Sequence, residues 1–170
     1  MGAGKSAVGP PLAERLGRRF VDSDMEIERS MARTVAEIFE SDGEETFRAC
    51  EREVIETLRE GDDVVALGGG AIAQPGATAL LGRSGTVVYL SARVSTLIHR
   101  LGDCANRPLL RGLDGKARAA RLTELLETRQ AAYLSAALVV VTDKFSVRHV
   151  VDEIARGLDG AMGSEQGAAP

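Results

Sequence analysis

Four short apolar segments, separated by stretches with helical spacing, restrict this chain to a small set of folds. They lie at residues 19–22, 63–67, 85–90 and 138–142. The last three are rich in valine and apolar almost throughout, which is typical of strands covered on both faces. Strands that alternate with helices predict βαβ units and a parallel sheet. We therefore predict an α/β fold, formed as one domain by residues 1–158.

The intervening stretches predict helices at residues 5–16, 25–30, 34–40, 42–59, 95–101, 117–132 and 147–158. Residues 102–115 are polar and contain glycines, so we expect a mobile loop there. Residues 159–170 are rich in glycine and alanine, and we expect them to form a disordered tail.

Charge and cysteine content exclude several classes of protein. The net charge is −4, which argues against nucleic acid as a partner. No apolar run approaches the ~20 residues that a membrane helix needs. Cys50 and Cys104 form no Cys-x-x-Cys pair, so neither a metal site nor a disulfide framework is expected. We predict a cytoplasmic, monomeric protein with neither a nucleic acid nor a membrane as partner.

The chain opens on Met1-Gly-Ala-Gly-Lys-Ser, the second half of a phosphate-binding loop of the G-x-x-x-x-G-K-[ST] type. Glycines let backbone N–H groups converge on phosphate oxygens, and the following helix adds its positive end. Lys5 would hold the β- and γ-phosphates of ATP, and Ser6 would bind Mg²⁺. The residues predicted to bind ATP here are Gly2, Ala3, Gly4, Lys5, Ser6 and Ala7. The alternative is a chance match at a chain end.

Two carboxylates, Asp22 and Asp24, stand where the first predicted strand ends. Residues at i and i+2 share one face of a strand, and ligands of α/β proteins bind at this edge. One carboxylate can then hold a metal-bound water, and the other can accept a substrate proton. The alternative is a helix N-cap formed by Ser23 or Asp24, and the pattern alone favours the cap.

A second glycine-rich turn and three arginines complete the candidate residues. A buried strand runs into Gly68, Gly69 and Gly70, which brings backbone close to a ligand or makes a tight turn. The arginines Arg48, Arg107 and Arg129 offer the planar guanidinium that suits a carboxylate or a phosphoryl group. For Arg48 the alternative is a surface pair with Glu51 at i+3.

Taken in order, these motifs resemble the shikimate kinase family from residue 1 to residue 158. The matching features are Gly-Ala-Gly-Lys-Ser, Asp22-x-Asp24, Asp42-Gly-Glu with Phe47-Arg48, Leu67-Gly-Gly-Gly-Ala71, Arg107-Pro-Leu-Leu110, and Arg129 followed by Tyr133. The resemblance implies a three-layer P-loop kinase fold with sheet order 2-3-1-4-5. It also implies a substrate-binding part at about residues 22–59 and a lid at about 102–115.

The resemblance further implies transfer of the ATP γ-phosphate to the 3-hydroxyl of shikimate, with Mg²⁺, on the route to chorismate and the aromatic amino acids. Lys5, Asp24 and Arg107 match the catalytic residues, and Asp24 also binds substrate hydroxyls. Asp22 matches the carboxylate that holds Mg²⁺ through water. The remaining implied contacts are Arg48 and Arg129 to the shikimate carboxylate, Gly68, Gly69 and Gly70 along the ring, and Arg100 near the adenine.

The chain also departs from the family pattern. The family's central first strand and first loop glycine would precede Met1, which suggests that Met1 is an internal methionine. Pro10 and Pro11 stand inside the first predicted helix, where each removes an N–H donor and favours a kink. Two further functions therefore stay open: a kinase of a related cyclic polyol, and a non-catalytic protein that still binds shikimate.

Overall fold

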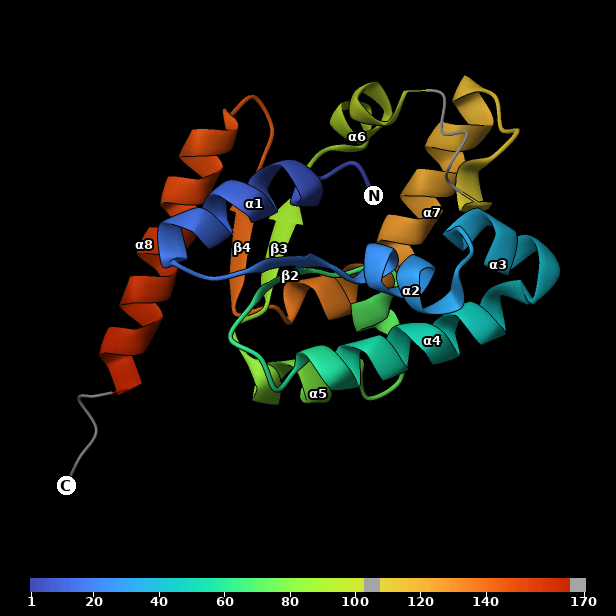
Figure 1. Cartoon of the computed structure of the whole chain (residues 1–170). Helices are drawn as coiled ribbons and strands as arrows, with labels where there is room; N and C mark the ends of the chain where they lie inside the picture. Colours follow the sequence, from blue (N-terminus) through green and yellow to red (C-terminus); the bar gives the residue numbers. More distant parts are fainter. Residues whose placement is uncertain (103–107, 166–170) are drawn as a thin grey trace.

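The computed structural model describes residues 1–102 and 108–165 and has an α/β fold with two parallel pairs of strands (Figure 1). In the first pair, β1 (Phe20–Asp22) lies beside β2 (Val64–Ala66). In the second pair, β3 (Val88–Ser91) lies beside β4 (Leu138–Val141). Three of these strands fall inside the predicted segments, β3 ends one residue beyond the predicted 85–90, and both pairs are parallel as predicted.

Among the described residues no strand joins β2 to β3, so the two pairs remain separate sheets. The interval is instead a groove of about 420 Å³, with an apolar lining that includes Leu12, Phe20, Val65, Leu67, Val88 and Leu90. We call this cavity the central groove.

Helices cover both faces of the strands. On one face α1 (Lys5–Leu16) and α8 (Val147–Glu165) pack along each other, and Leu12 and Ile154 form a core with Val140 of β4. On the other face α4 (Gly43–Leu58) and α5 (Ala77–Ser84) place Ile55 and Leu81 against the segments that contain β2 and β3. The strands are therefore sandwiched between two helical layers.

The predicted substrate-binding part forms a helical unit of its own. It consists of α2 (Ser23–Met31), α3 (Val35–Ser41) and α4, joined by the buried side chains of Ile27, Ile38 and Phe47. Thr34 caps α3 in a reciprocal arrangement with Glu37, which fixes where this short helix begins. Both short helices predicted for this region are confirmed.

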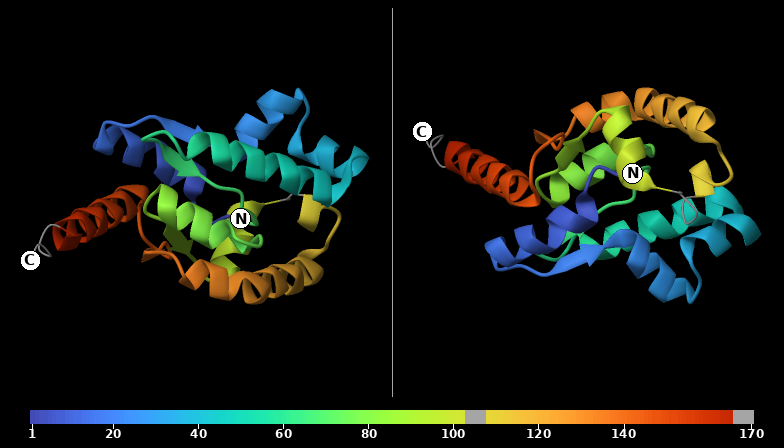
Figure 2. Two further views of the ribbon diagram at one scale, coloured as in Figure 1. Left: turned by 90° about the horizontal axis from the view of Figure 1, so that it is seen from below. Right: turned by 90° about the horizontal axis from the view of Figure 1, so that it is seen from above.

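The remaining helices enclose the site from the other side. They are α6 (Val94–Leu101), α7 (Gly115–Leu134) and the single 3₁₀ turns η1 (Ala71–Ala73) and η2 (Pro108–Leu110). Figure 2 shows α7 on one side of the molecule, α2 to α4 on the other, and the N-terminus between them. No helix of the described chain is both long and apolar enough to cross a membrane.

Two predictions about helices were wrong. Helix α5 was not predicted, because its eight residues bury only Ala77 and Leu81, too little for a periodic pattern. Helix α8 does not end at residue 158 but continues to Glu165, so the predicted disordered tail begins too early. Its anchored first turns, with Val150 and Ile154 buried in the core, allow the helix to propagate through glycines that composition assigns to a tail. Residues 166–170 lie outside the described residues.

Helix α1 runs through Pro10 and Pro11 without interruption. We expect Pro10→Ala to raise the free energy of unfolding by about 1–3 kcal/mol, because it restores an N–H donor to the helix interior. Pro10 is exposed, so the change removes no core contact. The midpoint temperature of thermal unfolding should rise by roughly 2–4 °C for each kcal/mol of added stability. The exposed Pro75, which lies in a turn, is the control, and an equal rise for Pro75→Ala would contradict the helix argument.

Candidate active site

The N-terminal segment, predicted to be a phosphate-binding loop, is a glycine turn that leads directly into α1. Gly2 and Gly4 have left-handed φ angles of 70° and 105°, which side chains on L-residues disfavour. The Gly4 carbonyl accepts hydrogen bonds from the N–H groups of Ala7 and Val8 at 3.0 and 2.9 Å, which starts α1. The first N–H groups of a helix have no partner within that helix, so this end suits an anion. Lys5 is the first residue of α1 and is half-buried.

Helix α6 packs directly on this loop. A Cβ atom on Gly2 would lie 3.0 Å from the Leu101 side chain and 3.2 Å from the Leu97 carbonyl oxygen. Arg100 donates to the hydroxyl and carbonyl oxygens of Thr142 at 2.9 and 2.6 Å, and to the Ala3 carbonyl at 3.4 Å. Arg100 thus connects the loop to the end of β4. Its predicted place near an adenine stays a prediction.

Asp22 and Asp24 do not share a strand face, and that part of the sequence argument is wrong. Strand β1 ends at Asp22 and α2 begins at Ser23, so Asp24 belongs to the first turn of a helix. Asp22 itself is the N-cap, because its carboxylate accepts from the Asp24 N–H at 3.0 Å. The helix is capped, but the prediction that Ser23 or Asp24 provides the cap was wrong, because α2 begins two residues earlier than predicted and Asp22 precedes it. The second oxygen of Asp22 accepts from the Ser6 hydroxyl at 3.4 Å, which links it to the phosphate-binding loop.

The three glycines after β2 form a turn against which the charged residues pack. A Cβ on Gly68 would lie 2.3 Å from a carboxylate oxygen of Glu51 and 2.9 Å from one of Asp24. The Gly68 N–H donates to the Ser23 hydroxyl at 3.1 Å, which holds the turn against α2. Only a residue without a side chain allows two carboxylates to approach the backbone so closely.

Arg48 pairs with Glu51 as the sequence alternative stated, but the pair is not on the surface. Glu51 is fully buried and bonds Arg48 at 2.7 Å, while the Arg48 side chain is 16% exposed. Arg48 also bonds Glu44 at 2.9 Å and lies over the Phe47 ring. Burial raises the pKa of Glu51, and the nearby Asp24 charge raises it further, whereas Arg48 opposes both effects.

Glu51 and Gln74 are site residues that the sequence interpretation missed. The Gln74 amide donates to Glu51 at 2.7 Å, so the carboxylate that orients Arg48 is itself held by the residue that follows η1. Phe47, Glu51 and Ile55 are buried at spacings of four on α4. An acidic residue in the middle of such a stripe was the available signal.

Helix α7 brings Arg129 and Tyr133 to the same glycine turn. The Arg129 guanidinium and the Tyr133 hydroxyl donate to the Gly69 carbonyl at 3.1 and 2.5 Å. A Cβ on the next residue, Gly70, would lie 2.5 Å from an Arg48 nitrogen. The two arginines predicted to act together therefore flank consecutive glycines. Burial raises the pKa of Tyr133, a residue to which the motif assigned no role.

Arg107 lies outside the described residues, as does most of the polar first half of the predicted lid. The second half is described and packs on the rest of the site. Leu110 is completely buried with Leu97 and Leu122, and Arg111 pairs with Glu40 of α3 at 3.4 Å. The segment after Arg107 thus spans from α6 to the substrate-binding part.

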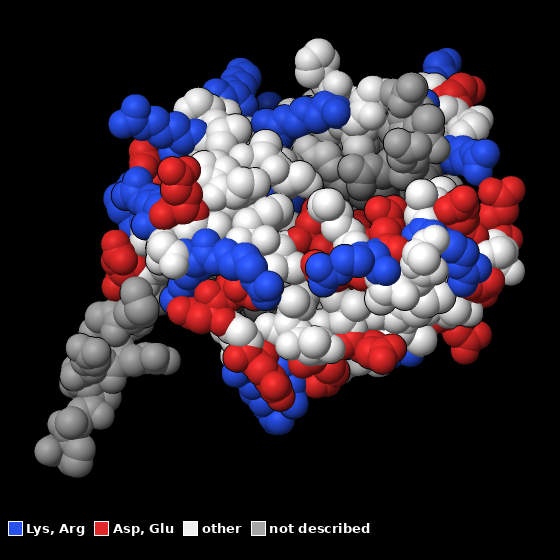
Figure 3. Space-filling model, viewed as in Figure 1, with Lys and Arg blue, Asp and Glu red and all other residues white. Residues whose placement is uncertain are grey.

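Within residues 1–102 and 108–165 no group of three or more His, Cys, Asp or Glu side chains has the arrangement of a metal site. The neighbouring oxygens of Ser6 and Asp22 are too few to enclose a metal ion by themselves. They suit Mg²⁺, which takes only a few ligands from the protein and fills its other positions with waters and phosphate oxygens. Cationic and anionic side chains are interspersed on the face shown in Figure 3. This face therefore presents no continuous basic surface to an anionic ligand.

A glycine turn with a lysine at the start of a helix, together with an arginine-lined glycine turn and a carboxylate, is the arrangement expected of a P-loop kinase that acts on a small molecule. The family model for shikimate kinase matches residues 1–159, and the chain belongs to this family. The shikimate kinase of Symbiobacterium thermophilum is 45% identical over 158 residues, which cover 91% of this chain and 89% of that protein. That of Chlorobium chlorochromatii is 40% identical over 167 residues, covering 95% and 88%.

The same family appears among solved structures. The shikimate kinase from Acinetobacter baumannii in complex with shikimate has a TM-score of 0.89 and 38% identity, and the match covers 95% of this chain and 89% of that chain. The shikimate kinase from Bacteroides thetaiotaomicron has a TM-score of 0.86 and 29% identity, covering 94% of both chains. The predicted family and fold class are confirmed.

Proposed function

We propose that this protein transfers the γ-phosphoryl group of ATP to the 3-hydroxyl of shikimate. The observation that carries the proposal is the convergence of Asp24, Arg48 and Arg129 on one glycine turn. Family membership supports the same activity, and the Acinetobacter baumannii relative was solved with shikimate bound. The product would feed the biosynthesis of aromatic amino acids.

The glycine turn provides the substrate side of the site. Arg48 and Arg129 come from different helices and present two guanidinium groups beside Gly69 and Gly70, an arrangement that suits a carboxylate. Asp24 lies beside Gly68 and supplies an acceptor for ring hydroxyls. A cyclic acid with hydroxyl groups satisfies both kinds of residue at once.

The phosphate-binding loop provides the nucleotide side. We assign the phosphates to the N–H groups of the loop and to Lys5, and the adenine end to the neighbourhood of Arg100. Ser6, with Asp22 through water, would hold Mg²⁺, which when bound neutralises charge on the phosphates. Arg107 is assigned to the phosphates from the lid, on the family resemblance alone.

The reaction then needs a base and the exclusion of water. Asp24 is the carboxylate next to the substrate turn, so it accepts the proton of the attacking hydroxyl. Lys5 stabilises the negative charge that develops on the transferred group. The Arg111–Glu40 pair connects the lid segment to α3, which favours a closed site in which ATP is not hydrolysed. We propose further that the protein acts as a monomer and is located in the cytoplasm.

The direct test is ADP release by this chain with ATP and Mg²⁺, measured with and without shikimate. We expect release that depends on shikimate. Phosphorylation of a cyclitol without a carboxylate, together with no response to shikimate, would assign the protein to a different polyol kinase. Calorimetric binding of shikimate without any ADP release would identify a non-catalytic binding protein.

We expect Gly70→Ala to raise the KM for shikimate about tenfold and also to lower the stability, because a displaced Arg48 pairs less well with the buried Glu51. The new methyl group would meet the Arg48 guanidinium at 2.5–2.7 Å and displace it, whereas the backbone at Gly70 (φ −99°) accepts alanine. The loss of one charge-assisted hydrogen bond to the substrate accounts for this factor. Steady-state kinetics and thermal unfolding measure the two quantities.

The control is Gly82→Ala, because a Cβ on Gly82 meets nothing within 4 Å and the residue is exposed on α5. Its KM should equal that of the unmodified chain, and its stability should rise slightly because alanine favours a helix. A KM for Gly70→Ala within twofold of the control would place the substrate away from Arg48.

A further inference from the structure

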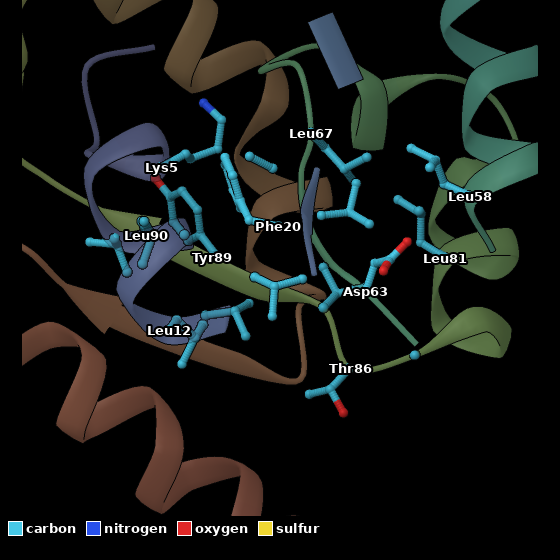
Figure 4. Close-up of a pocket in the computed structure, with 18 of the residues that line it drawn as sticks. Lys5, Leu12, Phe20, Leu58, Asp63, Leu67, Leu81, Thr86, Tyr89 and Leu90 are labelled. Carbon is cyan, nitrogen blue, oxygen red and sulfur yellow. The ribbon is translucent and has the colours of Figure 1, made fainter. Parts of the chain in front are cut away.

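We propose that Gln74 and Arg52 are positioning residues for the substrate carboxylate. They fix the orientation of Glu51, and through Glu51 that of Arg48, without touching the substrate themselves. The inference rests on the proposed function, because the two residues act only through the arginine that binds the substrate. The network lies apart from the central groove shown in Figure 4, since neither Gln74 nor Arg52 lines that cavity.

Glu51 accepts two hydrogen bonds on the same carboxylate oxygen. Arg48 Nη1 and Gln74 Nε2 both donate to Oε2 of Glu51, each at 2.7 Å. The other oxygen, Oε1, has no hydrogen-bond partner among the described residues and lies against Gly68. Two donors on one oxygen hold the plane of the carboxylate in a single direction. The side from which Glu51 meets the guanidinium is therefore set by Gln74 as well as by Arg48 itself.

Burial makes this orientation important. The Glu51 side chain is fully buried, and a charged group in such a place is costly unless it is paired and hydrogen-bonded. Burial raises the pKa of Glu51, and the hydrogen bonds from Arg48 and Gln74 oppose this rise. The Gln74 amide thus favours the charged form of Glu51, which is the form that pairs with Arg48.

Arg52 determines which end of the Gln74 amide faces Glu51. Its Nη1 donates to Oε1 of Gln74 at 2.7 Å. A guanidinium has donors only and a carboxylate has acceptors only, whereas an amide has one end of each kind. With its oxygen turned towards Arg52, the amide presents its NH₂ group to Glu51. The reverse orientation would set oxygen against oxygen on one side and donor against donor on the other.

The backbone before Gln74 is held in place as well. The turn η1 begins after Gly70, where a Cβ would lie 2.5 Å from an Arg48 nitrogen. Ala71 is completely buried, and its carbonyl accepts from the Gln74 N–H at 3.3 Å. Pro75 follows and favours the extended conformation observed at Gln74 (φ −73°, ψ 149°). The turn therefore meets the arginine at its first end and holds the carboxylate partner of that arginine at its last.

This arrangement leaves one side of Arg48 for the substrate. Nη1 is held by the buried Glu51, while Nε and Nη2 bond the exposed Glu44 at 3.3 and 2.9 Å. An exposed ion pair contributes little, so a substrate carboxylate can replace Glu44 there. Bidentate binding of a carboxylate requires the guanidinium plane to have a defined direction. Gln74 and Arg52 supply that direction from behind, through Glu51.

The first variant is Gln74→Met, which keeps the length of the side chain but removes the amide. We expect a KM for shikimate that is about fivefold higher, part of the effect of one charge-assisted hydrogen bond, with kcat and the KM for ATP unchanged. Steady-state kinetics are measured well below the unfolding temperature of each variant, so that a loss of stability alone does not alter KM. The matched control is Gln130→Met, because Gln130 is exposed on α7, and its KM should equal that of the unmodified chain.

Two variants of the exposed Arg52 test the orientation of the amide. Arg52→Lys keeps a cation that only donates, so its KM should equal that of the unmodified chain. Arg52→Glu introduces a group that only accepts and favours the reversed amide, so KM should rise at least as far as in Gln74→Met. Combined with Gln74→Met, Arg52→Glu should add nothing, because no amide is left to turn. A charge effect acting at a distance would raise KM equally in both backgrounds.

Equal KM values for Gln74→Met and its control would overturn the proposal. So would a fall in kcat as large as the rise in KM, which would indicate a general distortion of the site. Additive effects in the double variant would remove Arg52 from the network. Calorimetric binding of shikimate repeats the comparison without turnover. A failure of the proposed function appears already in the unmodified chain, as ADP release that ignores shikimate, whereas a failure of this inference appears only between the variants.

Discussion

Asp24→Asn should lower kcat by about 10²- to 10⁴-fold, the usual contribution of a positioned general base. Asparagine keeps the shape of the side chain in the first turn of α2 and its place beside Gly68, but it cannot take a proton. The binding of shikimate should weaken much less than kcat falls, because the amide oxygen still accepts a hydrogen bond from a ring hydroxyl. Steady-state kinetics give kcat, and calorimetry gives the Kd for shikimate.

The matched control for this prediction is Glu26→Gln. Glu26 lies two residues further along the same helix and pairs with Arg29 on the surface. It carries the same kind of charge but does not face the glycine turn, so kcat should be unchanged. A value for Asp24→Asn within threefold of this control would remove the base assignment and leave Asp24 as a binding residue only.

Arg48→Ala should have two effects at once, whereas Arg129→Ala should have one. Each variant loses a charge-assisted bond to the substrate carboxylate of about 1.5–3 kcal/mol, which corresponds to roughly a 10- to 150-fold increase in KM. Arg48→Ala also leaves the fully buried Glu51 without its cation. Breaking a buried pair costs about 3–5 kcal/mol, and the partial exposure of Arg48 places this one near the lower end. Arg129 bonds a carbonyl oxygen, so its loss spares the fold.

The pH dependence of stability separates these effects. Burial raises the pKa of Glu51, and Arg48 opposes this rise, so Arg48→Ala should raise that pKa further. A carboxyl group whose folded-state pKa exceeds its unfolded value binds more protons when folded, and stability therefore falls as pH rises through that interval. Urea unfolding should thus show a larger loss for Arg48→Ala near neutral pH than in mild acid.

Adding Glu51→Gln to Arg48→Ala should recover much of the lost stability without recovering KM, because it removes the buried charge and leaves the substrate unclamped. Stability losses of equal size in Arg48→Ala and Arg129→Ala, at both pH values, would show that the Arg48–Glu51 pair contributes little to the fold. A KM unchanged in both single variants would instead sink the carboxylate clamp.

The sequence predicted the elements that have strong local signals. Valine-rich strands and long amphipathic helices such as α4 carry their periodicity in the chain itself, so their positions were correct to within a few residues. The short α5 and the end of α8 were wrong, because packing against distant segments decides them and local pattern does not. The two carboxylates Asp22 and Asp24 were correctly expected near the end of β1. Their shared strand face was wrong, because Asp24 lies in the first turn of α2.

The sequence by itself determined the chemical types at the site: a glycine loop with Lys5, two aspartates, a glycine turn and basic side chains in family order. The tertiary structure alone decided how they act together. Arg129 and the Gly69 carbonyl are 60 residues apart in the chain and meet only because α7 folds back over the turn. Burial, which makes Glu51 a costly charge and Arg48 its necessary partner, is likewise a property of the packed molecule. The central groove lies between the edges of β2 and β3, which are distant in the sequence. No local sequence pattern shows that these two edges face each other, because the arrangement of distant strands is set by the overall topology.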